Sequence, residues 1–160
     1  MSIAICPGSF DPITLGHLNI IRRTSRIFDR VVVCVMYNSS KTSPMFTVEE
    51  RLDMVKRVVA KYPNVTVDSS DGLLAEYARQ FKGAVVVKGL RAASDFEYEF
   101  QMNLINKKIN PEMETMFLTS SGKYTFLSSS VVREMARYDG DMKGLVPDED
   151  VDNLVNTIHA

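Results

Sequence analysis

The sequence predicts an α/β fold in which five parallel strands form one sheet with helices on both faces. Three observations support this prediction. Short runs rich in β-branched residues alternate with longer amphipathic stretches, which is typical of β-α-β units. The run 31–36 is apolar throughout, as in a strand buried on both faces. The length of 160 residues fits one domain, which we expect to span residues 1–160.

Five short apolar segments, each bounded by polar residues or glycine, are expected to be strands: 3–6, 31–36, 65–67, 84–87 and 116–118. Parallel neighbours are joined by crossovers that are almost always right-handed. The arrangement is therefore Rossmann-like. Ligands of such sheets bind outside the carboxyl ends of the strands, where the strand order reverses.

Six stretches carry apolar residues at helical spacing. Thr47 and Glu50 form a T-x-x-E capping box, which marks the start of the second stretch. The expected helices lie at 18–28, 47–62, 74–81, 94–109 and 128–138, with an acidic helix after Pro147.

The expected helix 94–109 has two apolar stripes on roughly opposite sides, since successive residues are about 100° apart. A surface helix needs only one buried stripe, so we expect the second to line a ligand pocket or to face a neighbouring subunit. The stripes are Phe96, Phe100 and Leu104 on one side, and Tyr98, Met102, Ile105 and Ile109 on the other.

Composition and charge exclude several classes of protein. With 45% hydrophobic and 24% charged residues the chain is neither disordered nor of low complexity. Its 19 basic and 20 acidic residues lack the basic excess of nucleic-acid-binding proteins. No apolar run approaches the about 20 residues of a membrane span, and no signal peptide is recognisable, so we expect a cytoplasmic protein. Cys6 and Cys34 lie in predicted strands and are expected to be buried free thiols.

The standard glycine-rich phosphate loops are absent. The first strand leads instead into P-G-S-F-D-P-I-T-L-G-H at residues 7–17. This places His17 in the first turn of the next helix, where free N–H groups attract anions. An imidazole there can stabilise the charge that develops on a phosphate. The alternative interpretation is a helix cap with a packed histidine.

Three further signals follow strand ends: Lys41, the Lys88-Gly89-Leu90-Arg91 run and the serines at 128–130. A solvent-facing lysine, a solvated surface pair and ordinary N-capping would explain them singly. Together they place cations and N–H donors at one edge of the sheet, with no protein nucleophile. This favours phosphoryl or nucleotidyl transfer by positioning and charge stabilisation.

T-x-G-H at 14–17 and S-S-S-x-x-R at 128–133 resemble paired motifs of the nucleotidyltransferase superfamily. With F-T-V-E-E-R at 46–51, G-L-R-A at 89–92 and D-F-E-Y-E at 95–99, the chain resembles the bacterial phosphopantetheine adenylyltransferase family over essentially its whole length. The resemblance implies reversible transfer of an adenylyl group from ATP to 4′-phosphopantetheine, giving dephospho-coenzyme A and pyrophosphate in coenzyme A biosynthesis. It also implies Mg²⁺, a homohexamer and feedback inhibition by coenzyme A.

The resemblance implies catalytic roles for His17, Lys41 and Arg91, and no covalent enzyme intermediate. No acidic cluster marks a protein-built metal site, so we expect Mg²⁺ to be held mainly by the ATP phosphates. The implied substrate-binding residues are Ser9, Lys41, Leu74 and Lys88. The implied ATP-binding residues are Ser9, Phe10, His17, Gly89, Leu90, Arg91, Glu99, Tyr124, Thr125, Phe126, Leu127, Ser128, Ser129 and Ser130.

Lys88 stands where many family members have arginine, so the charge is kept but the bidentate fork is lost. Two alternatives from the residues stay open. One is a nucleotidyltransferase with another phosphorylated acceptor, such as nicotinamide mononucleotide or glycerol 3-phosphate. The other is a nucleotide-binding regulatory module without turnover, which would not need His17. A class I synthetase fragment is disfavoured, because the chain is too short for a tRNA-binding domain.

Overall fold

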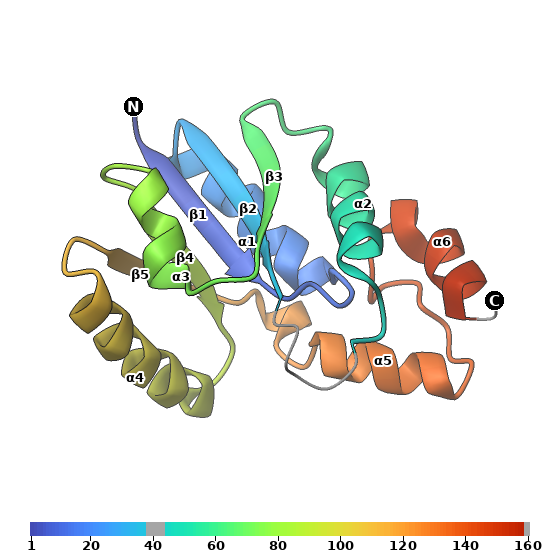
Figure 1. Cartoon of the computed structure of the whole chain (residues 1–160). Coiled ribbons are helices and arrows are strands. Elements are labelled where there is room, and N and C mark those ends of the chain that lie inside the picture. Colours follow the sequence, from blue (N-terminus) through green and yellow to red (C-terminus); the bar gives the residue numbers. More distant parts are fainter. Residues whose placement is uncertain (38–43, 159–160) are drawn as a thin grey trace.

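The computed structural model describes residues 1–37 and 44–158, without the side chains of residues 93 and 94, and it confirms the predicted fold (Figure 1). All neighbouring strands pair in parallel, in the order β3-β2-β1-β4-β5. Because β1 is central, the strand order reverses between β1 and β4. The strands are β1 (Ile3–Gly8), β2 (Arg30–Met36), β3 (Val65–Ser70), β4 (Val85–Leu90) and β5 (Glu114–Thr119).

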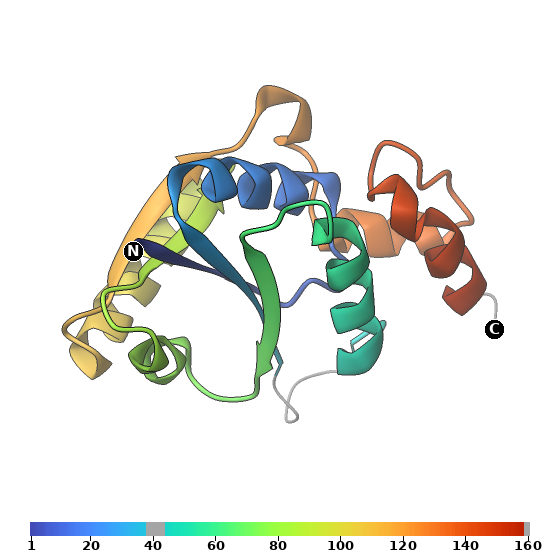
Figure 2. The ribbon, with the colours of Figure 1, turned by 90° about the horizontal axis from the view of Figure 1, so that it is seen from above.

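Helices cover both faces of the sheet. The helices α1 (Leu15–Ile27) and α2 (Val48–Val59) lie on one face, and α3 (Leu74–Tyr77) and α4 (Ala93–Ile109) lie on the other (Figure 2). Side chains alternate between the faces along each strand, so the sheet contributes to two separate apolar clusters. Cys6 lies in one cluster and Cys34 in the other, and both are buried free thiols as predicted.

The chain after β5 adds a second group of elements. A short 3₁₀ helix η2 (Gly122–Tyr124) leads to α5 (Ser129–Arg137) and then α6 (Asp148–Ile158). The carboxylate of Asp150 is buried against α2, where it pairs with Arg57. No helix in the described ranges is long and apolar enough to cross a membrane.

The structure corrects two expectations about the elements. The third predicted helix is a single turn, α3, followed by the 3₁₀ helix η1 (Ala78–Gln80). The strands also extend past their apolar centres, because ladder hydrogen bonds come from the backbone whatever the side chain. The polar residues 68–70 and Lys88 therefore lie inside β3 and β4.

On α4 neither predicted stripe is buried. Five of its apolar side chains are 46–61% exposed: Phe96, Tyr98, Phe100, Leu104 and Ile105. The residues of α4 that are less exposed to solvent are mostly polar and lie on one face of the helix. They include Asp95, Glu99, Met102, Asn103 and Asn106. A polar inner face is unsuited to core packing, and it lies beside the carboxyl end of β4.

Candidate active site

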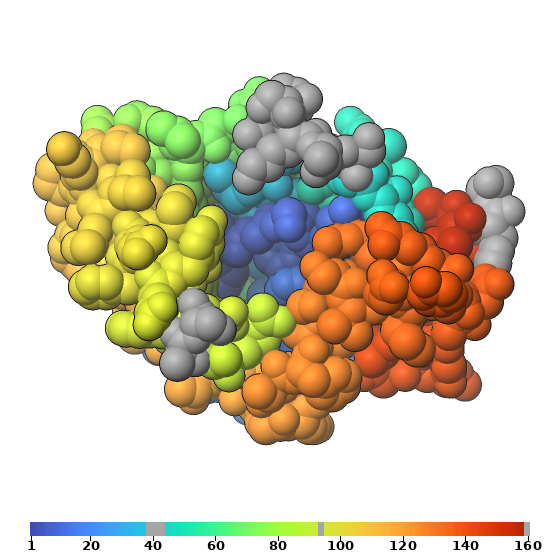
Figure 3. Space-filling view, turned by 90° about the horizontal axis from the view of Figure 1, so that it is seen from below, coloured from blue at the N-terminus to red at the C-terminus, as the bar shows by residue number. Residues whose placement is uncertain are grey.

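The carboxyl edge of the sheet carries a hollow. Figure 3 views the molecule from this side: the N-terminal segment, in blue, is recessed between the yellow residues of α4 and the orange residues of α5. The segment between β1 and α1, residues 9–13, is called the first loop below. It leaves β1 at the reversal of strand order, where ligands of such sheets bind.

The imidazole of His17 closes a capping box at the start of α1. The backbone N–H of Thr14 donates to His17 Nδ1 over 3.0 Å, and the backbone N–H of His17 donates to Thr14 Oγ1 over 3.2 Å. An Nδ1 atom that accepts an N–H bond carries no proton. In the neutral ring the proton therefore sits on Nε2, which is left as a donor.

Burial, together with the smaller effect of the positive charge of Arg91, lowers the pKa of His17 to about 4. The imidazole is consequently neutral near pH 7. Its ring also meets the ring of Phe10 edge to face, with centroids 5.1 Å apart. Phe10 is buried at a positive φ of 47° and packs over Gly8, where an added Cβ would lie 3.0 Å from the Phe10 ring. Residue 8 is therefore glycine because the Phe10 ring lies too close to its backbone for a side chain to fit.

Hydrogen-bond donors on α2 and α5 hold the carbonyl groups of the first loop. Arg51 Nη1 on α2 donates to the Ser9 carbonyl over 3.0 Å. From α5, Arg133 Nη1 donates to the Asp11 carbonyl over 2.8 Å. Ser129 Oγ donates to the Pro12 carbonyl, also over 2.8 Å.

The carboxylate of Asp11 fixes the loop to the start of α2. Its two oxygens accept the backbone N–H groups of Met45 and Phe46, each over 2.9 Å. Asp11 is 6% exposed and lies 3.8 Å from Arg133. The first loop is therefore anchored to both α2 and α5, segments far apart in sequence.

Two cations line the β4 side of the hollow, and α4 supplies a carboxylate to each. Lys88 Nζ lies 2.7 Å from Glu99 Oε2. Arg91 Nε lies 3.1 Å from Asp95 Oδ2, and Arg91 Nη1 donates to the Leu127 carbonyl over 3.0 Å. Arg91 thereby links the end of β4 to the entry of α5.

The three serines have distinct positions. Ser128 Oγ caps α5 by accepting a hydrogen bond from the Val131 N–H, and the hydroxyl of Ser129 donates to the Pro12 carbonyl. Ser130 Oγ accepts from Arg133. In the described part of the chain the backbone N–H groups of Ser129 and Ser130 donate no hydrogen bond, as expected in the first turn of a helix.

The other predicted site residues are spread around this centre. Lys41 lies outside the described residues. Leu74 begins α3 and packs against the apolar cluster of that face. At Gly89 a Cβ would lie 2.8 Å from Ile20 of α1, so glycine permits close packing there. Leu90 is half-buried, the Leu127 side chain is buried in the core, and Thr125 and Phe126 are exposed.

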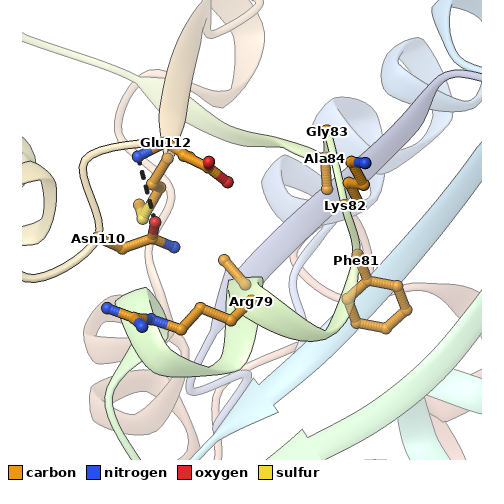
Figure 4. A pocket seen from close by; sticks show the side chains of 9 residues that line it. Arg79, Phe81, Lys82, Gly83, Ala84, Asn110 and Glu112 are labelled. Carbon is orange, nitrogen blue, oxygen red and sulfur yellow. Dashed lines mark hydrogen bonds between the residues drawn. The ribbon is translucent and has the colours of Figure 1, made fainter.

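Tyr124 packs beside Gly16 at the start of α1. It also lines an open groove of about 200 Å³ with Leu18, Arg22, Tyr62 and other residues. A larger pocket of about 260 Å³ lies at the opposite edge, before β4 and β5, and contains none of the predicted site residues (Figure 4). Within the described ranges no three His, Cys, Asp or Glu side chains are grouped to hold a metal ion.

Sequence reasoning gave no roles to Asp11, Arg51, Asp95 or Arg133, although all four lie in the motifs it singled out. Their functions depend on contacts with segments that are distant in the chain, such as Arg51 with Ser9 and Arg133 with Asp11. The only local signal is Asp95, which is spaced i,i+4 from Arg91.

Comparisons with known proteins show which sequences and folds this chain resembles. The family model described as cytidylyltransferase-like matches residues 5–135. A protein of Dictyoglomus turgidum is 54% identical over 91% of this chain and 90% of its own length. A protein of Caldanaerobacter subterraneus subsp. tengcongensis is 51% identical over 92% of each chain. Both of these relatives are named phosphopantetheine adenylyltransferase.

Among solved structures the fold is similar to "a Putative Nicotinate-nucleotide Adenylyltransferase from Vibrio parahaemolyticus". The TM-score is 0.72 and the match covers 99% of this chain and 96% of that one. At 19% sequence identity this likeness shows the fold alone.

Proposed function

We propose that this chain, which belongs to the phosphopantetheine adenylyltransferase family of cytidylyltransferase-like proteins, is an adenylyltransferase. It transfers an adenylyl group from ATP to 4′-phosphopantetheine. The products are dephospho-coenzyme A and pyrophosphate, and the reaction is a step of coenzyme A biosynthesis. The single nucleotidyltransferase domain spans residues 1–160.

The observation that carries the mechanism is the state of His17. Its Nδ1 accepts the Thr14 N–H, so the neutral ring has one N–H, at Nε2. We assign to this group a hydrogen bond to a non-bridging oxygen of the ATP α-phosphate. Such a preorganised donor favours the transition state, in which negative charge on that oxygen increases.

The reaction needs no protein base. A phosphate oxygen of 4′-phosphopantetheine attacks the α-phosphorus in line and forms a new P–O bond. The bond from the α-phosphorus to the bridging oxygen of the β-phosphate breaks, and pyrophosphate leaves with that electron pair. Both attacking and leaving groups are already anionic, so alignment and positive charge are what the site supplies.

Each cation of the site has a phosphate to hold in this mechanism. Arg91, which is near His17, and the free N–H groups at the start of α5 bind the ATP phosphates. Lys41 and Lys88 hold the phosphate of the acceptor, with Ser9 between the two substrates. Leu74 lines the pantetheine arm, and Tyr124 flanks the nucleotide. ATP phosphates and water would hold most of the coordination of a Mg²⁺ ion, which would offset part of the negative charge of the phosphates.

We propose a cytoplasmic homohexamer that coenzyme A inhibits by occupying the acceptor site. The exposed apolar residues of α4, including Phe96, Phe100 and Leu104, support subunit contacts, because a monomer rarely exposes so continuous an apolar patch. Sedimentation velocity tests this assignment: a six-fold mass is expected, and a monomer would contradict it.

A pyrophosphate-release assay tests the proposed function. The protein is incubated with ATP, Mg²⁺ and one acceptor: 4′-phosphopantetheine, nicotinamide mononucleotide or glycerol 3-phosphate. Turnover is expected only with 4′-phosphopantetheine. Turnover with another acceptor alone would refute the substrate assignment. Binding of ATP without turnover in any arm would favour a regulatory module.

A further inference from the structure

Arg51 on α2 is buried and has no acidic partner among the residues that the structure describes. Its side chain is 3% exposed. Nη1 donates to the Ser9 carbonyl over 3.0 Å, and Nε donates to the Thr47 carbonyl over 3.4 Å. Across the described residues, no carboxylate forms an ion pair with it.

A second arginine on the same helix shows the ordinary arrangement. Arg57 lies six positions further along α2 and pairs with the buried carboxylate of Asp150. Burying an unpaired charge is costly, and proteins normally pair it with an opposite charge. The lack of an ion pair for Arg51 among the described residues therefore needs an explanation.

Among the described charged side chains that belong to the first loop or form hydrogen bonds with it, two arginines and one carboxylate leave an excess of one positive charge. Arg51 and Arg133 both donate to carbonyls of the loop, at Ser9 and Asp11. The carboxylate that the loop itself contributes is Asp11, and it is already bonded to two backbone N–H groups. A buried positive charge attracts anions strongly, because little water screens it.

The contact with Ser9 has a second effect. A carbonyl oxygen carries partial negative charge, which repels a phosphate. The carbonyl that Arg51 holds is fixed toward α2, and the Asp11 and Pro12 carbonyls are likewise held by α5 donors. Arg51 thus both orients the loop and adds positive charge beneath it.

We propose that Arg51 is a positioning residue for the phosphate chain: it holds the Ser9 carbonyl away from the site and supplies the unbalanced charge that attracts the pyrophosphate part of ATP. It acts through the loop and touches no substrate. This inference rests on the proposed function for the identity of the ligand, a polyphosphate that binds over the first loop.

The test uses inorganic pyrophosphate as the probe, with binding measured by calorimetry and melting temperatures measured with and without pyrophosphate. The variants are Arg51→Lys, which keeps the charge, and Arg51→Gln and Arg51→Met, which remove it. Arg57→Gln is the matched control on the same helix.

We expect Arg51→Gln and Arg51→Met to weaken pyrophosphate binding about tenfold or more, and Arg51→Lys to weaken it less than about threefold. Without ligand, Arg51→Met is expected to melt within a few degrees of the unmodified protein, because the removal of an unpaired buried charge offsets the loss of its hydrogen bonds to the Ser9 and Thr47 carbonyls. Arg57→Gln should do the opposite: it lowers the melting temperature by leaving Asp150 unpaired, and it leaves pyrophosphate binding unchanged.

Unchanged binding in Arg51→Gln would overturn the proposal. So would equal loss of binding in the lysine and glutamine variants, since the charge would then have no role. A ligand-free Arg51→Met protein that is unfolded, or melts well below the unmodified protein, would show that the arginine serves the fold. If the unmodified protein binds pyrophosphate but does not adenylylate 4′-phosphopantetheine, the proposed function fails and the inference about Arg51 stands.

Discussion

The two halves of the hollow are built by different interactions. The first loop is held by hydrogen bonds to its backbone carbonyls and by a buried carboxylate, Asp11. The β4–α4 half is held by the ion pairs of Lys88 with Glu99 and Arg91 with Asp95. The side chains of these pairs are 21–39% exposed.

Because of this difference, we expect one half to control the stability of the fold and the other to control the affinity for substrate. Buried hydrogen bonds are not screened by salt, and a lost partner leaves an unsatisfied group. Partly exposed ion pairs contribute little to the free energy of unfolding and weaken as salt is added. Changes in the first loop should therefore alter both folding and turnover, whereas changes in the β4–α4 half should alter substrate binding alone.

The largest expected effect comes from His17→Ala. Removing one preorganised donor to the α-phosphate should lower kcat by about 10²–10³-fold, measured by steady-state pyrophosphate release. His17→Gln is the control, because glutamine at this position can restore the capping box of α1. It should recover the melting temperature without recovering kcat. A fall of less than tenfold in His17→Ala would remove the role assigned to the imidazole.

The second expected effect is on folding. Asp11→Asn keeps one acceptor oxygen where the carboxylate has two, so the N–H of Met45 or Phe46 loses its partner. The free energy of unfolding should fall by about 1–3 kcal/mol, as measured by urea titration. A change below about 0.5 kcal/mol would mean that the carboxylate does not anchor the loop.

Asp95→Asn makes the matching change in the other half. Arg91 loses the carboxylate that orients its guanidinium, and we expect this loss to outweigh the gain from a more positive site, so the KM for ATP should rise about three- to tenfold, while the free energy of unfolding changes by less than about 0.5 kcal/mol. Added KCl should raise the KM of the unmodified protein more than that of the variant. Asp95→Glu is expected to recover part of the affinity. A large loss of stability in Asp95→Asn would erase the distinction between the halves.

The smallest expected effect is that of Lys88→Arg. Arginine can bind a phosphate through two N–H groups and still pair with Glu99, so the KM for 4′-phosphopantetheine should fall by about two- to fivefold at similar kcat. Lys88→Gln should raise it. A rise in KM for the arginine variant would show that this site is shaped for lysine.

The fold could be predicted because its signals are local. Strand runs, the Thr47–Glu50 capping box and the position of His17 in the first turn of α1 are all confirmed. The strands were predicted too short. Residues such as Ser70 and Leu90 pair through their backbone, and no apolar run marks them as part of a strand. On α4, apolar periodicity did not identify a fully buried stripe: Met102 and Ile109 of one stripe are half-buried, and the shielded positions Asp95, Glu99 and Asn106 are polar.

The site could be placed at the carboxyl edge but not assembled in detail. The sequence shows that His17, Arg91 and the serines follow strand ends. It does not show that Ser129 bonds to Pro12 or Arg51 to Ser9, because these pairs meet only after folding, across 117 and 42 positions. The cap formed by His17 is present in the structure, although at the sequence level it was only the alternative interpretation of this motif, because the usual capping box has Glu or Gln at the position of His17.

The state of His17 is the centre of the account, and ¹⁵N NMR of histidine-labelled protein measures it directly. The chain has two histidines, so a His159→Gln variant leaves His17 as the only signal. A base whose pKa falls from 6.5 to about 4 stays neutral as the pH is raised from 5 to 8. The account predicts a neutral ring with its proton on Nε2 throughout that range. A ring protonated at Nδ1, or one that titrates near pH 6.5, would contradict it.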